Sequence, residues 1–230
     1  PDLCVSASAL EEYHNCKGQY SKGRGQKNVT FCSDDEDAVS MAMTALYRLM
    51  KRSGLDYADI GRLEVGTESQ VDRAKSIKSF LMALFEENRC HDVLGADTYN
   101  ACYGGTNALF NSLAWIQGDS WNGKYAIVIC SDTAVHPDRD HLSGIGASSV
   151  AMLIGPDASL VIEPERASFM KHSWDFYRPI GWKNNDAIID IDIATEQYEE
   201  ALASCQEIFA SQHGTDDLLS VFDYAAFHCN

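Results

Sequence analysis

"YAIVIC", residues 125–130, is an uninterrupted apolar run that Ser131 and Asp132 follow directly. A run of this kind predicts a strand that is buried on both faces. Such strands occur mainly in parallel sheets that helices cover on both sides. The segment therefore favours an α/β fold.

The segments on either side of this run alternate between helical and extended patterns. Ser33 to Glu36 fits a capping box and predicts the start of a helix, with Met41 and Leu46 on its apolar side and Gly54 beyond its end. Further strands are expected over 60–66, 92–97, 148–155, 159–163 and 220–228, and further helices over 75–88, 106–117 and 195–212. The alternation predicts a layered sandwich around a largely parallel sheet.

The composition limits the class of protein. The chain has 230 residues, of which 45% are hydrophobic and 23% charged, so it can bury a sizeable core. Its net charge of −16 opposes binding to nucleic acid or to an anionic membrane surface. No apolar run approaches the roughly 20 residues that span a bilayer. Because the chain starts without Met and stops after an apolar run, we expect it to be a piece of a longer protein.

The eight cysteines are scattered singly, without a C-x-x-C pair. This usage predicts reduced thiols in an intracellular compartment and argues against structural zinc. "GIGASS" (144–149) lacks a third glycine and precedes a strand, so it is not a dinucleotide fingerprint. The histidines and acids of "HPDRDH" (136–141) are interpreted as solvated loop charges.

Four chemically active side chains follow the ends of predicted strands. They are Glu68, Cys102, Asp132 and His228. In open α/β sheets, ligands bind at the edge formed by the carboxyl ends of the strands. A thiol, two carboxylates and an imidazole on one edge predict an active site.

Cys102 lies in "NACYGG" (100–105), directly before a predicted helix. A lone cysteine is usually a small buried hydrophobe. Here, however, Gly104 and Gly105 allow a sharp turn and leave room for a ligand. The N-terminus of the helix should favour a thiolate. Spacing alone leaves packing and nucleophilic chemistry both open.

The other three residues have similar alternatives. Glu68 is either a solvated cap carboxylate or a general base. His228 is either a hydrogen-bonded core histidine or a donor to a substrate carbonyl. Asp132 either orients neighbouring groups or caps the next turn.

Several motifs together resemble a known family. They are "GRLEVGTES" (61–69), "NACYGGTNALFNSLAWI" (100–116), "SWNGKYAIVICSDTAV" (120–135), "SVAMLIGP" (149–156) and "HSWDFYRP" (172–179). The chain resembles the eukaryotic-type 3-hydroxy-3-methylglutaryl-CoA (HMG-CoA) synthases of the thiolase superfamily from about residue 10 to 228. The resemblance implies a thiolase-like fold, a layered α-β-α-β-α sandwich. Residues 1–230 would then form most of its N-terminal half, without the first strand and the second half.

The resemblance also implies a cytoplasmic, homodimeric acyltransferase of the mevalonate route to isoprenoids and sterols. It would condense acetyl-CoA with acetoacetyl-CoA and water, without a metal or organic cofactor. Cys102 would carry the acetyl group, Glu68 would be the general base, and His228 would polarise the acceptor ketone. Four further residues would line the pocket, namely Tyr103, Asp132, Asp175 and Phe176.

The chain departs from the family pattern at Leu94, at Ala96 and in "HPDRDHLSGIGASS" (136–149). Two alternatives stay open, one because of these departures and one because the second half of the fold is expected to be missing. One is a related β-branching enzyme whose acceptor is bound to a carrier protein, although an acidic surface disfavours an acidic partner. The other is a catalytically inert half-domain that only binds or pairs.

Overall fold

The computed structural model of the chain describes residues 1–134, 144–180, 187–215 and 217–228. The chain divides into two compact units, Pro1–Ser159 and Leu160–Asn230. They are called the first and the second unit below, and each is described on its own. The segment 136–141 lies outside the described residues, so its interpretation as a solvated loop stays a prediction.

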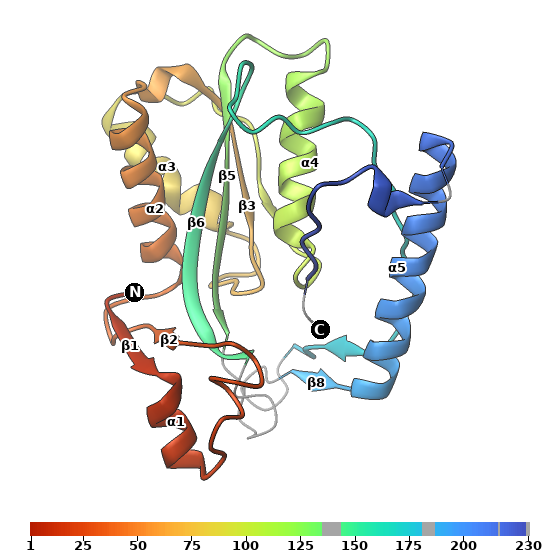
Figure 1. Ribbon diagram of the computed structural model, residues 1–230. Helices are drawn as coiled ribbons and strands as arrows, with labels where there is room; N and C mark the ends of the chain where they lie inside the picture. The colour runs from red at the N-terminus through yellow and green to blue at the C-terminus, as the bar shows by residue number, and fades with distance from the viewer. Residues whose placement is uncertain (135–143, 181–186, 216, 229–230) are drawn as a thin grey trace. The chain divides into compact units, whose positions relative to one another are not determined.

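A four-stranded sheet forms the centre of the first unit, in the order β4-β3-β5-β6 (Figure 1). The central strands β3 (Ile60–Gly66) and β5 (Tyr125–Ala134) run parallel, and β4 (Asp97–Thr98) lies parallel to β3. Only β6 (Gly146–Ile154) is antiparallel, along the outer side of β5. The predicted, largely parallel sheet is therefore confirmed.

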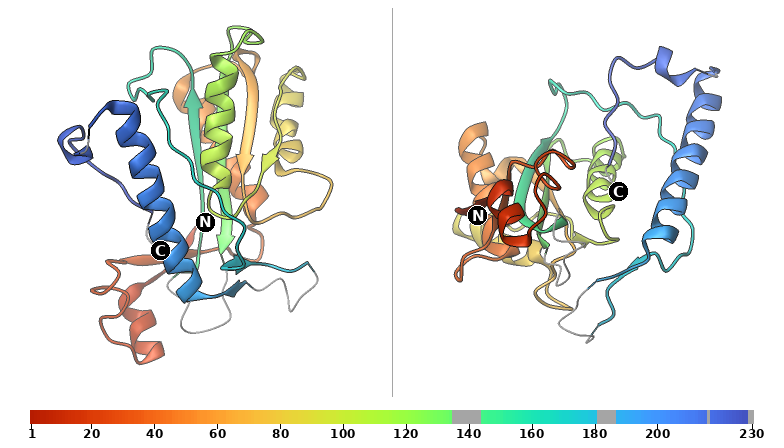
Figure 2. Two further views of the ribbon diagram at one scale, coloured as in Figure 1. Left: turned by 90° about the vertical axis from the view of Figure 1, so that its right-hand side faces the viewer. Right: turned by 60° about the horizontal axis from the view of Figure 1, so that its bottom comes forward.

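Helices cover both faces of this sheet (Figures 1 and 2). One face carries α2 (Ala38–Ser53) and α3 (Ile77–Glu87), and the other carries α4 (Gly104–Ile116). The main core lies on the α2 and α3 side. It includes Leu46, Leu63, Val65, Leu81, Phe85, Ile127 and Ile129, all with less than 1% of their surface exposed. Alternate residues of β5, such as Val128, are equally buried, so this strand is covered on both faces as its apolar run predicts.

The capping box of α2 lies four residues after its predicted position. Asp37 is the N-cap, and its side chain accepts a hydrogen bond from the Ser40 amide. Ser33 and Glu36 instead bond to each other in a turn that precedes the helix. The helix ends where predicted, because Gly54 adopts a left-handed conformation with φ of 71°.

An N-terminal β-α-β segment was not predicted. It consists of β1 (Leu3–Ser6), α1 (Ala7–His14) and β2 (Asn28–Phe31), and its two strands pair antiparallel. β2 also reaches the central sheet, since the Thr30 hydroxyl donates to the Ala147 carbonyl of β6 over 2.6 Å. Both strands are only four residues long, which explains their weak sequence signal.

The strand predicted over 92–97 is shorter than expected. Gly95 has φ of 114°, and a side chain there would collide with the Leu63 carbonyl. This turn separates an isolated bridge at Leu94 from β4. In contrast, α4 begins at Gly104, two residues before its predicted start, and β5 continues to Ala134, so that Asp132 lies inside the strand.

The second unit contains β7 (Phe176–Tyr177), β8 (Ile188–Ile189), the long helix α5 (Ile191–His213) and the short η4 (Leu218–Ser220). The strands predicted over 159–163 and 220–228 are wrong, because the described residues there form none. Leu160 and Val161 are more than three-quarters exposed. An apolar run becomes a strand only where a neighbouring strand supplies hydrogen bonds.

Candidate active site

A strained turn presents Cys102 at the carboxyl edge of the sheet. Ala101, the preceding residue, has φ of 44°, which is uncommon for a residue other than glycine. The amides of Tyr103 and Gly104 close the turn on the carbonyls of Asn100 and Ala101 over 3.0 and 3.2 Å. Cys102 is thereby held two residues before the start of α4 and is exposed.

The two glycines after Cys102 let α4 pack closely on the sheet. A Cβ on Gly66 of β3 would collide with the backbone of Gly104 and Gly105. A Cβ on Gly105 would collide with the sulfur of Cys130, which lies beneath the helix on β5. A Cβ on Gly104 would collide with the Thr98 carbonyl. Each of the two glycines is therefore required by a close neighbour, and the contact between the backbones of Gly66 and Gly105 sets the height of Cys102 above the sheet.

Glu68 reaches Cys102 from the neighbouring strand. It lies two residues beyond the end of β3, and the Cys102 thiol donates a hydrogen bond to its Oε1 over 3.5 Å. The two residues are 34 positions apart in the sequence. The structure thus brings together the predicted nucleophile and the predicted base.

Asp132 anchors the segment that carries Glu68. Its Oδ1 accepts hydrogen bonds from the Glu68 amide over 2.6 Å and from the Ser69 hydroxyl over 3.0 Å, and it lies 3.1 Å from the Thr67 hydroxyl. Of the two roles open to Asp132, the structure therefore favours orientation of its neighbours.

The predicted stabilisation of a thiolate is wrong for this structure. Although the residue as a whole is exposed, desolvation of its sulfur, the charge of Glu68 with its hydrogen bond, and the charge of Asp132 raise the pKa of Cys102 from 9.0 to about 11. These effects outweigh the N-terminus of α4. The group at neutral pH is a thiol that donates its hydrogen to Glu68.

Tyr103, the remaining predicted site residue of the first unit, is the N-cap of α4 and is 40% exposed. Its hydroxyl lies 3.3 Å from Oδ1 of Asn107. Tyr103 follows Cys102 directly and is accessible to a ligand. Its role in binding substrate stays a prediction.

The other predicted site residues belong to the second unit. Asp175 precedes β7, and its carbonyl accepts a hydrogen bond from the Asp190 amide over 2.8 Å. Phe176 pairs with Ile189 between β7 and β8. His228 is exposed and lies outside any strand, and its carbonyl accepts a hydrogen bond from the Tyr198 hydroxyl over 2.9 Å. Their places around Cys102 stay predictions.

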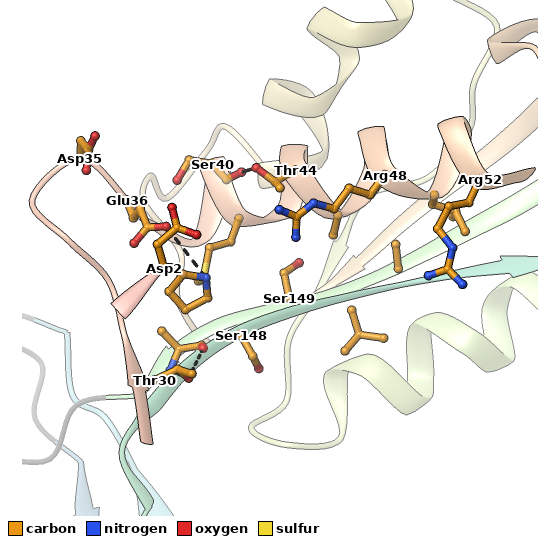
Figure 3. Close-up of a pocket in the computed structure, with 17 residues that line it drawn as sticks. Asp2, Thr30, Asp35, Glu36, Ser40, Thr44, Arg48, Arg52, Ser148 and Ser149 are labelled. Carbon is orange, nitrogen blue, oxygen red and sulfur yellow. Dashed lines mark hydrogen bonds and ion pairs between the residues drawn. The ribbon is translucent and has the colours of Figure 1, made fainter. Parts of the chain in front are cut away.

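A cavity of about 720 Å³ lies elsewhere, between α2 and residues 147–151 of β6 (Figure 3). Arg48 and Arg52 of α2 line it together with Ser148 and Ser149 of β6. Cys102, Glu68 and Asp132 are not among its lining residues. The cavity therefore does not belong to the site around Cys102.

Within the described ranges, no three or more His, Cys, Asp and Glu side chains are grouped so as to hold a metal ion. In the same part of the chain, no helix has both the length and the apolar character needed to cross a bilayer.

Sequence analysis missed Thr67 and Ser69. Their signal was the hydroxyl residue on each side of the glutamate in "GTES" (66–69). Hydroxyl side chains often bond to nearby backbone, so the pattern alone does not distinguish a local turn from an anchor to a distant strand.

Two family models cover the chain. Residues 1–159 match "Hydroxymethylglutaryl-coenzyme A synthase N terminal", and residues 160–230 match "Hydroxymethylglutaryl-coenzyme A synthase C terminal". The models meet where the two compact units meet. That residues 1–230 form one N-terminal half of the fold stays a prediction.

Curated relatives carry the same description. Hydroxymethylglutaryl-CoA synthase of Saccharomyces cerevisiae is 44% identical over 99% of this chain and 48% of its own length. The cytoplasmic hydroxymethylglutaryl-CoA synthase of Gallus gallus is 41% identical over 99% of this chain and 46% of its own length. The chain therefore spans about half the length of the curated relatives it matches.

Solved structures agree on the fold. MvaS in complex with 3-hydroxy-3-methylglutaryl coenzyme A is 28% identical, with a TM-score of 0.85 over 95% of this chain and 53% of that chain. PksG, an HMG-CoA synthase from Bacillus subtilis, has a TM-score of 0.84 over 96% of this chain and 54% of that chain, and at 20% identity it shows the fold alone. These neighbours have the thiolase-like fold, which confirms the predicted fold class.

Proposed function

Because the chain belongs to the hydroxymethylglutaryl-CoA synthase family, we propose that the protein condenses acetyl-CoA with acetoacetyl-CoA and water to give HMG-CoA and CoA. The observation that carries the proposal is the pair formed by Cys102 and Glu68. Their sulfur and carboxylate oxygen lie 3.5 Å apart at the carboxyl edge of the sheet. This pairing supplies a nucleophile and a base to one substrate.

In the first proposed step, the Cys102 sulfur attacks the carbonyl carbon of acetyl-CoA. The bond between this carbon and the CoA sulfur breaks, and CoA leaves as a thiol with the proton that Cys102 gives up. The product is an acetyl thioester on Cys102. A covalent intermediate of this kind divides one difficult condensation into two easier steps.

In the second step, Glu68 removes a proton from the methyl group of this thioester. The thioester carbonyl stabilises the resulting carbanion, which attacks the ketone carbon of acetoacetyl-CoA. The ketone oxygen becomes a hydroxyl after protonation, and we assign its polarisation to His228. Water then cleaves the thioester on Cys102 and releases HMG-CoA.

Four further residues are assigned to the pocket that holds these substrates, namely Tyr103, Asp132, Asp175 and Phe176. Asp132 would support the site by holding Glu68 in place, since its carboxylate accepts a hydrogen bond from the Glu68 amide. The CoA thioesters are substrates, and the proposed chemistry needs neither a metal nor an organic cofactor. By analogy with relatives named cytoplasmic in Gallus gallus and Pongo abelii, we propose that the protein acts in the cytoplasm. Its place in the mevalonate pathway and its assembly as a homodimer are proposed from the family resemblance alone.

Mass spectrometry of the protein after incubation with acetyl-CoA tests the first step. We expect the peptide that contains Cys102 to gain one acetyl group, and Cys102→Ala to lose this label. Glu68→Ala should still accept the acetyl group but should form HMG-CoA at least about 100-fold more slowly. Acetylation at another residue, or none, would refute the assignment and support an inert half-domain.

Comparison of two acceptors tests the substrate class. We expect turnover with acetoacetyl-CoA and little with an acetoacetyl group on a carrier protein, because the chain carries a net charge of −16. The reverse preference would identify a β-branching enzyme instead.

A further inference from the structure

The hydroxyl groups that flank Glu68 have different partners. The Thr67 hydroxyl accepts a hydrogen bond from the Ser69 amide over 2.9 Å, and its own hydrogen can reach the Ser131 carbonyl over 2.8 Å or Asp132 over 3.1 Å. A hydroxyl has one hydrogen to donate, and the shorter distance favours the main chain of β5. Thr67 therefore fixes the end of β3 to β5.

The Ser69 hydroxyl is the bridge to Asp132. It accepts a hydrogen bond from the Thr133 amide over 2.9 Å, which uses a lone pair and leaves its hydrogen free to donate. The acceptors within reach are Oδ1 of Asp132 over 3.0 Å and the Thr133 carbonyl over 3.4 Å. The charged and nearer oxygen is the better partner, so Ser69 links the β5 backbone to Asp132.

This link holds Glu68 from both sides. The amide of Glu68 is bound to Asp132, and the next residue is bound to β5 through its side chain. The backbone of Glu68 therefore cannot move away from β5 unless the bonds of Ser69 break. Cys102 is separately fixed by the contact between the backbones of Gly66 and Gly105. The separation of 3.5 Å between thiol and carboxylate depends on both constraints.

We propose that Ser69 is a positioning residue whose hydroxyl, through Asp132 and the Thr133 amide, sets the distance between the Glu68 carboxylate and Cys102. The inference rests on the proposed function in one respect, that Glu68 acts as the base on an acetyl group held by Cys102. The geometric part concerns the resting protein and can be measured without turnover.

The pH dependence of Cys102 alkylation by iodoacetamide, followed by mass spectrometry of its peptide, tests the geometric part. The charges that act on the sulfur are those of Glu68, beyond β3, and Asp132, on β5, and the Cys130 thiol of β5 lies beneath the same helix. In the wild-type protein the midpoint should lie near pH 11. Ser69→Ala removes the side-chain bonds of Ser69 and leaves the bond of the Glu68 amide to Asp132, so the Glu68 carboxylate should be held less closely to the sulfur and the midpoint should fall.

Three further variants make this test specific. Ser69→Thr keeps the hydroxyl and should restore the wild-type profile. Ser112→Ala removes a buried hydroxyl of α4 that donates to the Ala108 carbonyl of the same helix, and it should leave the profile unchanged. If Ser69→Ala does not fold, Ser69→Cys, a similar shape with a weak donor, replaces it. If Ser69→Ala, or Ser69→Cys in its place, folds and retains the wild-type profile, the proposal is overturned.

Steady-state kinetics test the catalytic consequence. We expect Ser69→Ala to lower kcat for HMG-CoA formation by about tenfold, as for one lost hydrogen bond, with KM for acetyl-CoA unchanged and recovery in Ser69→Thr. If the wild-type protein forms no HMG-CoA, the proposed function fails while the alkylation profile still decides the role of Ser69. If the wild type turns over and Ser69→Ala matches it, the role of Ser69 is refuted alone.

Discussion

Desolvation of the Cys102 sulfur, together with the charges of Glu68 and Asp132, raises the pKa of this thiol to about 11. At pH 7 about one thiol in 10,000 with this pKa is ionised. Because alkylating agents and oxidants react with the thiolate, the resting residue should be poorly reactive toward them. In the proposed cycle, acetylation replaces the thiol hydrogen, and Glu68 then faces the acetyl group.

The substitution Glu68→Gln should lower the pKa of Cys102 and make the thiol more reactive. Glutamine keeps the size of the side chain but removes its charge, which is the second-largest cause of the raised pKa. We expect the midpoint of Cys102 alkylation to fall below the wild-type value near pH 11, with faster alkylation at pH 8. Glu87→Gln, an exposed change at the end of α3, is the control. Identical profiles for Glu68→Gln and wild type would contradict the arrangement.

The sequence predicted which residues meet at this site better than it predicted their electrostatics. Cys102 and Glu68 each follow a strand of one parallel sheet, and parallel strands bring their carboxyl ends to one edge. The N-terminus of α4 is local to Cys102 and therefore visible in the sequence. The opposing charges come from residues about 30 positions away, and their distance from the sulfur depends on side-chain packing. The anchoring by Ser69 depends on such packing too.

At the scale of elements, the contact between β3 and α4 sets the height of the site. Gly66→Ala would drive a Cβ into the backbone of Gly104 and Gly105, and neither glycine has a side chain that can move aside. We expect a loss of about 1–3 kcal/mol in the free energy of unfolding, measured by denaturant titration, because α4 must shift. Cys102 should also lose its hydrogen bond to Glu68.

Gly146→Ala is the matched control for this prediction. Gly146 also lies in a strand of the sheet, but among the described residues a Cβ there would meet only the Thr30 carbonyl, at 3.8 Å. This variant should unfold at nearly the wild-type denaturant concentration. Equal losses in both variants would show that glycine matters here only through strand propensity.

Elements with a long periodic or apolar pattern were predicted well, and short ones were not. Most residues of β3 and the apolar run of β5 are buried, so their composition alone identifies them as strands. β1, β2, β7 and β8 have two to four residues and depend on partners distant in sequence. The apolar residues of 159–163 suggested a strand, yet no strand pairs with them in the described part of the chain. Pairing is a tertiary property that a local pattern does not contain.

The loop after α1 depends on a buried carboxylate. Glu11 accepts hydrogen bonds from the amides of Tyr20 and Ser21 over 2.9 and 2.6 Å. Backbone hydrogen bonds from Ser21 and Gly18 lower the pKa of Glu11 from 4.5 to about 2. Because the folded-state pKa is lowered, the carboxylate stabilises the fold above pH 4.5, and this contribution is lost as the pH falls toward 2.

Glu11→Gln should therefore lower the unfolding temperature at pH 7 and flatten its decline between pH 4.5 and pH 2. Thermal unfolding followed by circular dichroism at several pH values measures both effects. Glu12→Gln changes an exposed neighbour on the same helix and should preserve the wild-type curve. A Glu11→Gln curve parallel to that of the wild type would exclude this carboxylate as a source of acid sensitivity.

At the scale of the whole molecule, the two units differ in how they are held together. The first unit has a buried core between its sheet and the helices α2 and α3. In the second unit, α5 has no fully buried residue among those described. Because burial of apolar surface is the main favourable term in folding, the first unit should be the more stable of the two.

Limited proteolysis with a glutamate-specific endoproteinase measures this difference. Residues 155–175 form no helix or strand, and Glu165 is exposed among them, whereas the Glu163 bond precedes proline and should resist cleavage. In the first unit, Glu11 and Glu64 are buried, and Glu12, Glu86 and Glu87 lie in the helices α1 and α3. Glu36 and Glu68 lie in turns, where hydrogen bonds to Ser33 and to Asp132 and Cys102 hold them. We therefore expect an early cut after Glu165 and a persistent fragment of residues 1–165. Glu165→Gln should delay its release, and equally rapid cleavage within residues 1–134 would contradict a stable first unit.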